Sequence, residues 1–234
     1  MTTPEPDRAD PTDTGAGTDT RTARALRGLG HDHPSVRLGA ALAAGTSPDP
    51  RLVGALIERC AREPDFSVRE TLTWALTRHP PALTVPGLVA ELGDERALAR
   101  SQALHTLSKI GDPRAWPAIT RALLTDTDDE VARSAWRAAV ALVPDGAEPA
   151  LAEVLASQLG RGGRATRLSL SRALIALGGA AAPVLSAALG APDPRVRAHA
   201  IATDRLARDP DAGFESAIEE AKRVMALGET GRAG

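Results

Sequence analysis

Residues 99–142 decide the fold and read ARSQALHTLSKIGDPRAWPAITRALLTDTDDEVARSAWRAAVAL. This stretch holds two copies of one short pattern, which begins at Ala99 in the first copy and at Val131 in the second. Small or apolar residues follow four, seven and eight places after each of these anchor positions. Such offsets lie on one stripe of an α-helix, because the helix repeats every 3.6 residues. The pattern therefore predicts an amphipathic helix that starts near each anchor.

The same pattern recurs along most of the chain. Successive anchors are 32, 31, 32, 35 and 30 residues apart, and an arginine follows the anchor in five of the six copies. A period in this range indicates a repeat architecture, in which each unit buries its apolar face only against its neighbours. The six anchor dipeptides are Val36-Arg37, Val68-Arg69, Ala99-Arg100, Val131-Ala132, Thr166-Arg167 and Val196-Arg197.

A second apolar stretch lies upstream of five of these helices, with a proline at or near its start. Proline costs little in the first turn of a helix, where its missing N–H would have had no partner. No window of the sequence shows the alternation of a β-strand between turns. We therefore predict an all-α fold, an α-solenoid of about six two-helix repeats. The first helices of five repeats are expected at 52–60, 85–92, 116–124, 151–159 and 184–189.

The composition fits closely packed helices. Aromatic residues make up only 2% of the 234 residues, so the core must rest on alanine and branched aliphatic side chains. A formal net charge of −2 excludes a strongly basic nucleic-acid-binding protein. The single cysteine, Cys60, cannot form an internal disulfide, and its apolar stripe predicts a buried, inert thiol. No run of 18 apolar residues occurs, so we expect no signal peptide, no membrane span and a cytoplasmic location.

Three segments are expected from the distribution of apolar residues. Residues 1–20 carry five acidic residues against one arginine and almost no apolar side chain, which predicts a disordered acidic N-terminal tail. Residues 21–212 form the predicted solenoid. Residues 213–234 are predicted to form a capping helix, amphipathic over 213–228, and a short flexible end.

Over residues 21–208 the chain resembles the short HEAT-like repeats first associated with phycocyanobilin lyases. The resemblance rests on the repeated order of Val-Arg, a small residue and Leu, followed in residues 111–115 by Gly-Asp-Pro-Arg-Ala. It implies a right-handed superhelix whose concave side is lined by the second helix of each repeat. It also implies that the repeated arginine bonds to an acidic residue of a neighbouring interhelix loop, forming a ladder. The acids expected in this role are Asp32, Asp65, Asp94, Asp129 and Asp193, and repeat five has the basic, acid-free loop 160–164 instead.

Residues three and six places after each anchor are expected to point outward into the concave groove. Tryptophan and arginine occur among and beside these positions in the middle repeats, and they are residue types that anchor protein interfaces. In the alternative interpretation, Trp74 and Trp136 pack over the next helix and His105 is a plain surface histidine. The predicted partner-binding residues are Trp74, Gln102, His105, Arg133, Trp136, Arg137 and Arg172.

These features favour a non-catalytic, monomeric scaffold that binds a protein partner and needs no cofactor or metal. His31-Asp32-His33 is interpreted as a loop cap rather than as a metal site. The chain has no His-Glu dipeptide, the pattern with which di-iron hydroxylases of this repeat class hold iron. Residues 160–163 are glycine-rich but match no phosphate-binding loop. No catalytic residue is therefore predicted.

Two alternatives stay open. Arginines along the second helices would suit a groove that cradles nucleic acid, as in DNA glycosylases built from HEAT-like repeats, although the ladder would occupy about half of them. The other alternative is a bilin-lyase-like enzyme, which no residue of the sequence specifically supports.

Overall fold

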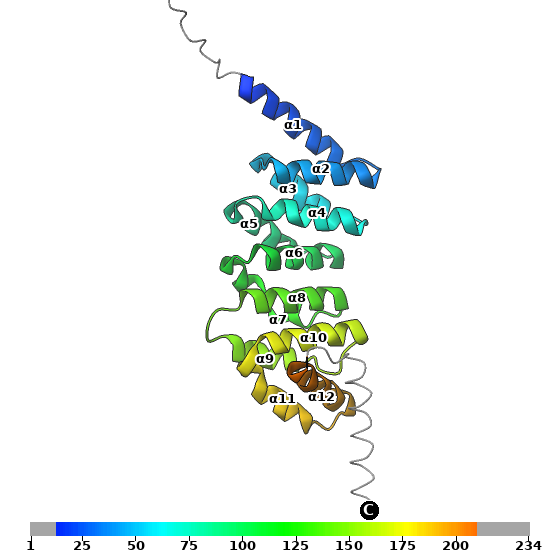
Figure 1. Cartoon of the computed structure of the whole chain (residues 1–234), viewed down its shortest axis with the longest axis vertical. Helices are drawn as coiled ribbons and strands as arrows, with labels where there is room; N and C mark the ends of the chain where they lie inside the picture. The colour runs from blue at the N-terminus through cyan, green and yellow to red at the C-terminus, as the bar shows by residue number, and fades with distance from the viewer. Residues whose placement is uncertain (1–12, 210–234) are drawn as a thin grey trace, which may run out of the picture. The chain divides into compact units, whose positions relative to one another are not determined.

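The computed structural model describes residues 13–209, and every regular element in that range is helical (Figure 1). In chain order the α-helices follow one another as α1–α2, α3–α4, α5–α6, α7–α8, α9–α10 and α11–α12, which confirms the predicted all-α solenoid of two-helix repeats. The predicted capping helix and flexible end, 213–234, lie outside the described residues. The elements are α1 (Asp13–Leu29), α2 (Pro34–Thr46), η1 (Pro50–Leu52), α3 (Val53–Cys60), α4 (Phe66–Thr77), α5 (Pro81–Glu91), α6 (Ala97–Ile110), η2 (Pro113–Ala118), α7 (Arg121–Leu124), α8 (Asp129–Leu142), α9 (Glu148–Ala156), α10 (Arg164–Ala176), η3 (Gly178–Ala181), α11 (Ala182–Leu189) and α12 (Pro194–Arg208).

The chain divides into two compact units, Met1–Thr84 and Val85–Gly234. In the first unit α2 packs against both α1 and α4, and α3 packs against α4. Small residues permit these close approaches. A Cβ atom added to Gly28 on α1 would lie 2.7 Å from the Cβ of Ala40 on α2, a separation that real side chains do not reach. The hairpin of α1 and α2 therefore depends on glycine at this crossing.

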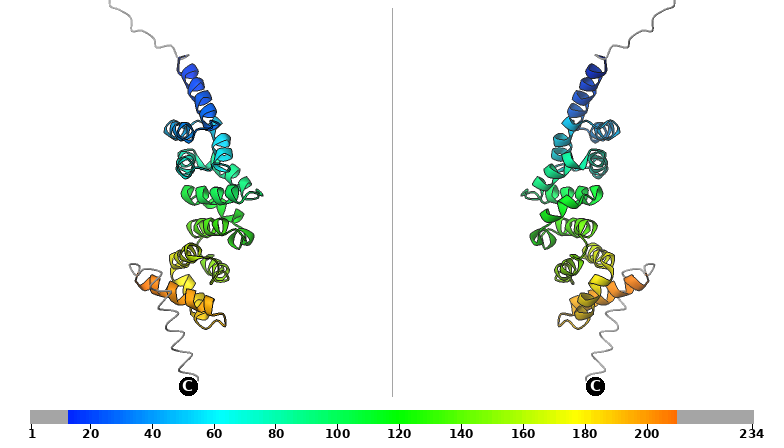
Figure 2. Two further views of the ribbon diagram at one scale, coloured as in Figure 1. Left: turned by 90° about the vertical axis from the view of Figure 1, so that its right-hand side faces the viewer. Right: turned by 90° about the vertical axis from the view of Figure 1, so that its left-hand side faces the viewer.

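The second unit repeats one packing step. Helix α8 packs against α6 on one side and against α10 on the other, and α10 packs against α12. Within each unit the second helices of successive pairs lie side by side, as the three views of the ribbon show (Figures 1 and 2). One period of the sequence pattern therefore corresponds to one step from a second helix to the next in this stack.

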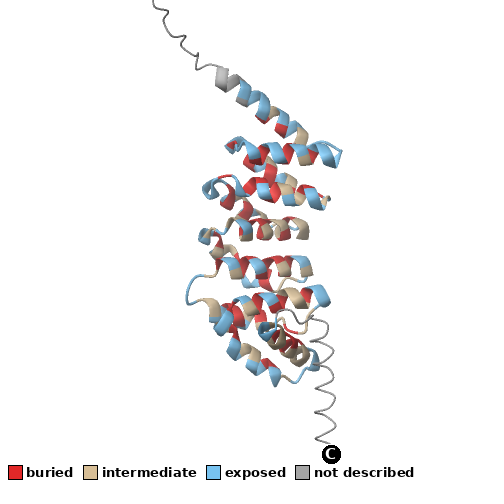
Figure 3. Ribbon diagram, viewed as in Figure 1, coloured by how far each residue is buried: buried red, intermediate tan, exposed pale blue. Residues whose placement is uncertain are grey.

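The core follows the stripe of small and apolar residues. Residues four and eight places after the anchors are buried in most copies, with Leu72, Leu76 and Leu107 fully enclosed. Full burial of a leucine side chain stabilises the fold by about 1.5–3 kcal/mol. Figure 3 shows these buried residues along the helices, with exposed residues on the loops and the open faces. The anchor residue of the first copy, Val36, does not belong to this buried set and is exposed.

Two sequence-based boundaries are wrong. Helix α1 begins at Asp13, so residues 13–20 of the predicted disordered tail are helical, and Asp19 forms an ion pair with Arg51 at 2.7 Å. Residues 1–12 of that tail lie outside the described residues. The helix expected at 116–124 is split into η2 and α7, because Pro117 lies inside η2 and Thr120 caps a new helix by accepting a hydrogen bond from Leu123.

Helix α6 ends at a glycine. Gly111 caps α6 with a φ of 69°, in the left-handed region that glycine adopts without a Cβ penalty, and its N–H donates to the Leu107 carbonyl.

Candidate functional site

The repeated arginine clamps the loop that precedes its own helix. In four copies its Nη1 donates to two successive carbonyls, those six and five residues upstream, at 2.6–2.9 Å. The carbonyl is a backbone acceptor that would otherwise need water or another donor, so the clamp fixes the direction of the loop. The four arginines are Arg37, Arg69, Arg100 and Arg197. Their Nη1 donors are committed to the protein's own backbone.

Two of these arginines also form the ladder that the resemblance implied. Arg37 donates to both oxygens of Glu63, each at 2.7 Å, and Arg100 pairs with Asp126 at 3.0 Å. The expected acids Asp65 and Asp129 are wrong for these two rungs. Asp65 instead caps α4 by accepting a hydrogen bond from the Val68 N–H at 3.0 Å.

Glu63 is the most constrained charge of the first unit. Its side chain is fully buried and accepts from Arg37, from Arg59 at 2.7 Å and from the Asp65 N–H at 2.9 Å. Burial would raise the pKa of this carboxyl, but the hydrogen bonds from Arg37, Asp65 and Arg59 outweigh burial and lower the pKa to about 2. Glu63 is therefore a structural anion rather than a catalytic acid.

The fourth repeat carries its rung with the charges exchanged. Ala132 stands where the other copies have arginine. Arg161 lies six residues before Arg167, the place that Glu63 takes before Arg69 and Asp126 takes before Ala132. Arg161 reaches back to Asp129 at 2.9 Å, and the Thr166 hydroxyl donates to the other oxygen of that carboxylate. The basic loop that the sequence singled out is thus held by an acid of the preceding repeat.

His199 joins the fifth and sixth repeats and is not an outward-facing residue as its position predicted. It is 1% exposed, and its Nδ1 accepts from the Gly160 N–H at 3.0 Å. Nε2 therefore carries the proton and lies 3.0 Å from the Arg167 carbonyl. Burial lowers the pKa of His199 to about 4, so the ring is neutral near pH 7.

The residues six places after the anchors form the exposed stripe of the second helices. Leu42 and Trp74 are exposed in the first unit, Arg137 and Arg172 are exposed in the second, and His105 is half-buried. The sixth copy departs from the pattern, because Ala202 is fully buried and packs against Leu168 and Leu206.

Trp74 agrees with both alternatives left open by the sequence, because it packs on another helix and is also exposed. A Cβ added to Gly45 would lie 2.3–2.9 Å from three atoms of the Trp74 ring, so the indole packs over α2 where glycine leaves room. The residue is nevertheless 41% exposed. Trp74 therefore presents one side of its ring to solvent within the first unit.

Trp136 was predicted to contact a partner, and that prediction is wrong. The residue is 0% exposed, and its Nε1 donates to the Leu124 carbonyl of α7 at 2.8 Å. It lies five places after its anchor, where the side chain turns toward the paired helix. Burial there satisfies both the apolar ring and its single polar group.

The remaining predicted residues lie on successive helices of the second unit. Gln102 and His105 are half-buried on α6, and Arg172 is exposed on α10. On α8 between them, Arg133 pairs with Glu130, and Arg137 donates to the Ser134 hydroxyl at 3.0 Å. These five residues lie on the helices α6, α8 and α10, which pack in succession in the second unit, whereas Trp74 belongs to the other unit. Their role in binding stays a prediction.

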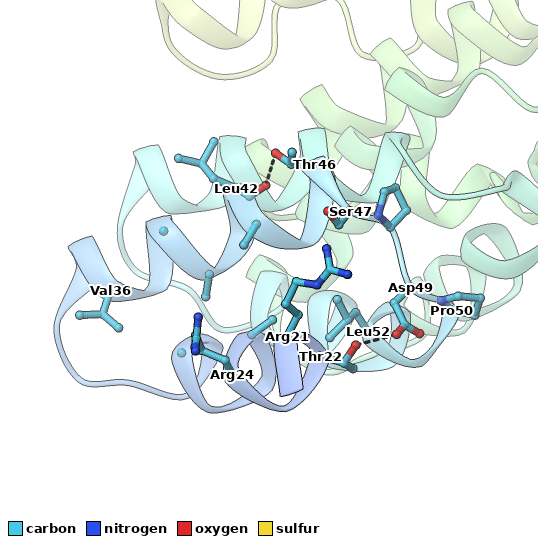
Figure 4. A pocket seen from close by; sticks show the side chains of 16 residues that line it. Arg21, Thr22, Arg24, Val36, Leu42, Thr46, Ser47, Asp49, Pro50 and Leu52 are labelled. Atoms are coloured by element: carbon cyan, nitrogen blue, oxygen red, sulfur yellow. Dashed lines mark hydrogen bonds between the residues drawn. The ribbon is translucent and has the colours of Figure 1, made fainter. Parts of the chain in front are cut away.

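The first unit contains a groove that the residue pattern does not predict. It has a volume of about 980 Å³ and runs between α1, α2 and η1 (Figure 4). Its lining is mostly apolar and includes Val36, Leu42 and Leu52. At one end Asp49 accepts from Thr22 at 2.6 Å and pairs with Arg51 at 2.7 Å. These hydrogen bonds, led by those from Arg51, hold the pKa of the Asp49 carboxyl well below its usual range.

Two further sequence interpretations are confirmed. Cys60 is buried at 2% exposure, and His33 caps α2 by accepting from the Ser35 N–H. Within residues 13–209, no three His, Cys, Asp or Glu residues lie together as metal ligands. No single described helix is long and apolar enough to cross a membrane; a bent pair, Arg164–Ala176 with Gly178–Leu189, reaches that length and hydropathy only when joined.

Part of the chain is similar to a known repeat family. A family model of HEAT repeats matches residues 53–141. No curated protein matches the chain. One similar solved structure is the complex of CpcE and CpcF of phycocyanin lyase from Nostoc, which is 21% identical, with the match covering 76% of this chain and 74% of that one. The TM-score of this match is 0.45.

Proposed function

We propose that this chain, whose residues 53–141 match HEAT repeats, serves as a non-catalytic, monomeric scaffold in the cytoplasm. HEAT repeats suggest a protein-interaction role, which is the coarse function that the family match supports. The finer proposal is that a protein partner docks on exposed residues of the second helices, with Trp74 as the candidate in the first unit and Arg137 and Arg172 as the candidates in the second.

The observation that carries the proposal is the exposure of large apolar side chains in the first unit. Two exposed large hydrophobic residues, Leu42 and Trp74, lie on the exposed stripe of the adjacent helices α2 and α4. Exposed apolar residues on adjoining elements are typical of surfaces that bind other proteins. The buried ladder supports the same proposal, because a rigid stack presents such residues without a cost of ordering at the moment of binding.

Affinity capture from the native host tests this function. The double variant Trp74→Ala with Arg137→Glu should lose the captured partner while circular dichroism shows unchanged helicity. The control is Leu189→Ala, which truncates an exposed leucine of the second unit and should retain capture. If the double variant captures the same partner as the wild type, the stripe is not the docking surface.

A nucleic-acid partner is the second candidate, favoured by one observation. Arg137 and Arg172 are exposed on the neighbouring helices α8 and α10, and neither belongs to the arginine ladder. Phosphate contacts made by such residues would give an affinity that falls steeply with salt. A gel shift at low and moderate salt decides the matter, and a chain that shifts no duplex or single strand at low salt excludes this candidate.

A further inference from the structure

The groove of the first unit is called here the α1–α2 groove, and its lining residues lie between positions 21 and 52. It has an open end and a closed end. Helices α1 and α2 touch where Gly28 faces Ala40. From that crossing the two helices diverge toward the start of α1 (Figure 1). Side chains from both helices and from η1 line the space between them (Figure 4).

The floor of the groove is apolar and exposed. Val36 is 41% exposed and Leu42 is 47% exposed, and both line it. The lining along α2 extends from Val36 to Thr46. Ten helical steps span about 15 Å, the length of roughly three turns of a docked helix.

The rim of the groove is cationic. Arg21 and Arg24 are exposed on α1 and line the groove. In the described part of the chain neither forms an ion pair with a carboxylate, and the Nε of Arg21 donates only to the Gly17 carbonyl at 3.3 Å. The one acid of the lining, Asp49, is already neutralised by Arg51. An occupant therefore meets an apolar floor beside two positive charges.

We propose that the α1–α2 groove binds an acidic amphipathic helix of a protein partner, a proposal that rests on the scaffold function above. Apolar side chains at helical spacing would cover Val36 and Leu42, while glutamate or aspartate on the flank would pair with Arg21 and Arg24. Nucleic acid fits this groove poorly, because phosphates gain nothing from the apolar side chains that form most of its lining. Residues 1–12 of this chain fit poorly too, since they have almost no apolar side chains.

Fluorescence anisotropy with designed peptides tests the proposal on the full chain. One labelled peptide of about 12 residues carries leucine at helical spacing and glutamate elsewhere, and its matched control carries lysine in place of glutamate. The glutamate peptide should bind at least about tenfold more tightly at low salt, and the difference should shrink as salt screens the rim. Equal affinity for the two peptides would overturn the proposal.

Matched variants locate the binding. Leu42→Asp and the pair Arg21→Glu with Arg24→Glu should each weaken binding of the glutamate peptide at least about tenfold. The controls Leu26→Asp and Arg27→Glu change exposed residues of α1 that do not line the groove, and should leave the affinity within about twofold. If groove variants and controls lose affinity equally, the peptide binds elsewhere or the unit has unfolded, and circular dichroism separates the two.

Other occupants give different results. Sedimentation that shows a dimer dissociated by Leu42→Asp would make a second copy the occupant and overturn the proposal. Binding that appears only after deletion of residues 1–12 or 210–234 would make this chain's own segment the occupant. Loss of peptide binding alone refutes the acidic helix and leaves the scaffold intact, provided that partner capture still depends on Trp74 and Arg137.

Discussion

The substitution Glu63→Gln tests how far the ladder supports the first unit. Glu63 is fully buried and receives hydrogen bonds from two arginines and one backbone N–H. Glutamine would turn an N–H₂ group toward donors that need an acceptor, and Arg37, itself 5% exposed, would keep its charge without a counterion. Breaking a buried ion pair in this way costs about 3–5 kcal/mol.

A second route gives a similar magnitude. The pKa of Glu63 falls from its ordinary 4.5 to about 2 in the folded chain. At 1.36 kcal/mol for each unit, that difference corresponds to about 3 kcal/mol of stability at neutral pH. For a domain of this size, a loss of 3–5 kcal/mol lowers the melting temperature by roughly 6–20 °C.

Urea unfolding followed by circular dichroism measures the effect. The control is Glu58→Gln, because Glu58 pairs with Arg62 on the surface, where the side chains are 65% and 51% exposed. Exposed pairs of this kind contribute about 0–1 kcal/mol. If Glu63→Gln costs no more than Glu58→Gln, the buried ladder does not stabilise the unit and the reasoning is refuted.

Three further predictions follow from the same contacts. The stability advantage of the wild type over Glu63→Gln should stay constant from pH 7 down to about 5 and vanish as the pH approaches 2. A carboxylate whose pKa is lowered in the folded chain stabilises the fold at pH values above its pKa in the unfolded chain, and this contribution is lost when the carboxylate is protonated. Urea midpoints of both proteins at pH 7, 5 and 3 show whether the two stability curves converge. In the fourth repeat, Ala132→Arg with Arg161→Asp should rebuild the ordinary rung. In a double-mutant cycle, the free energy of unfolding of the double variant should exceed the value expected from adding the two single effects by about 0.5–1 kcal/mol. Additive effects would contradict the interpretation that the charges of this rung are exchanged. Gly45→Ala should displace the Trp74 ring and destabilise the first unit by about 1–3 kcal/mol. The control Gly54→Ala, at a position with open space around it, should be neutral or stabilising. An unshifted tryptophan emission in Gly45→Ala would show that the ring is not packed against this glycine.

The architecture could be read from the sequence because it depends on local spacing. The stripe after each anchor, the prolines at helix starts and Gly111 at a helix end are interactions within one turn or one helix, so the order of residues determines them. The six helix pairs follow from repetition of that pattern. The exposure of Leu42, Trp74, Arg137 and Arg172 follows from the same helical period.

The tertiary structure alone decided which side chains meet across repeats. Loop geometry selects Glu63 rather than Asp65 as the partner of Arg37, because Asp65 is turned onto the start of α4. The fate of Trp136 depends on a carbonyl of α7 that lies 12 residues away in the sequence. The α1–α2 groove, with Val36 exposed on its floor, exists because α1 crosses α2 at Gly28 and then diverges. A crossing angle is set by how two whole surfaces pack, and no periodicity within a single helix encodes it.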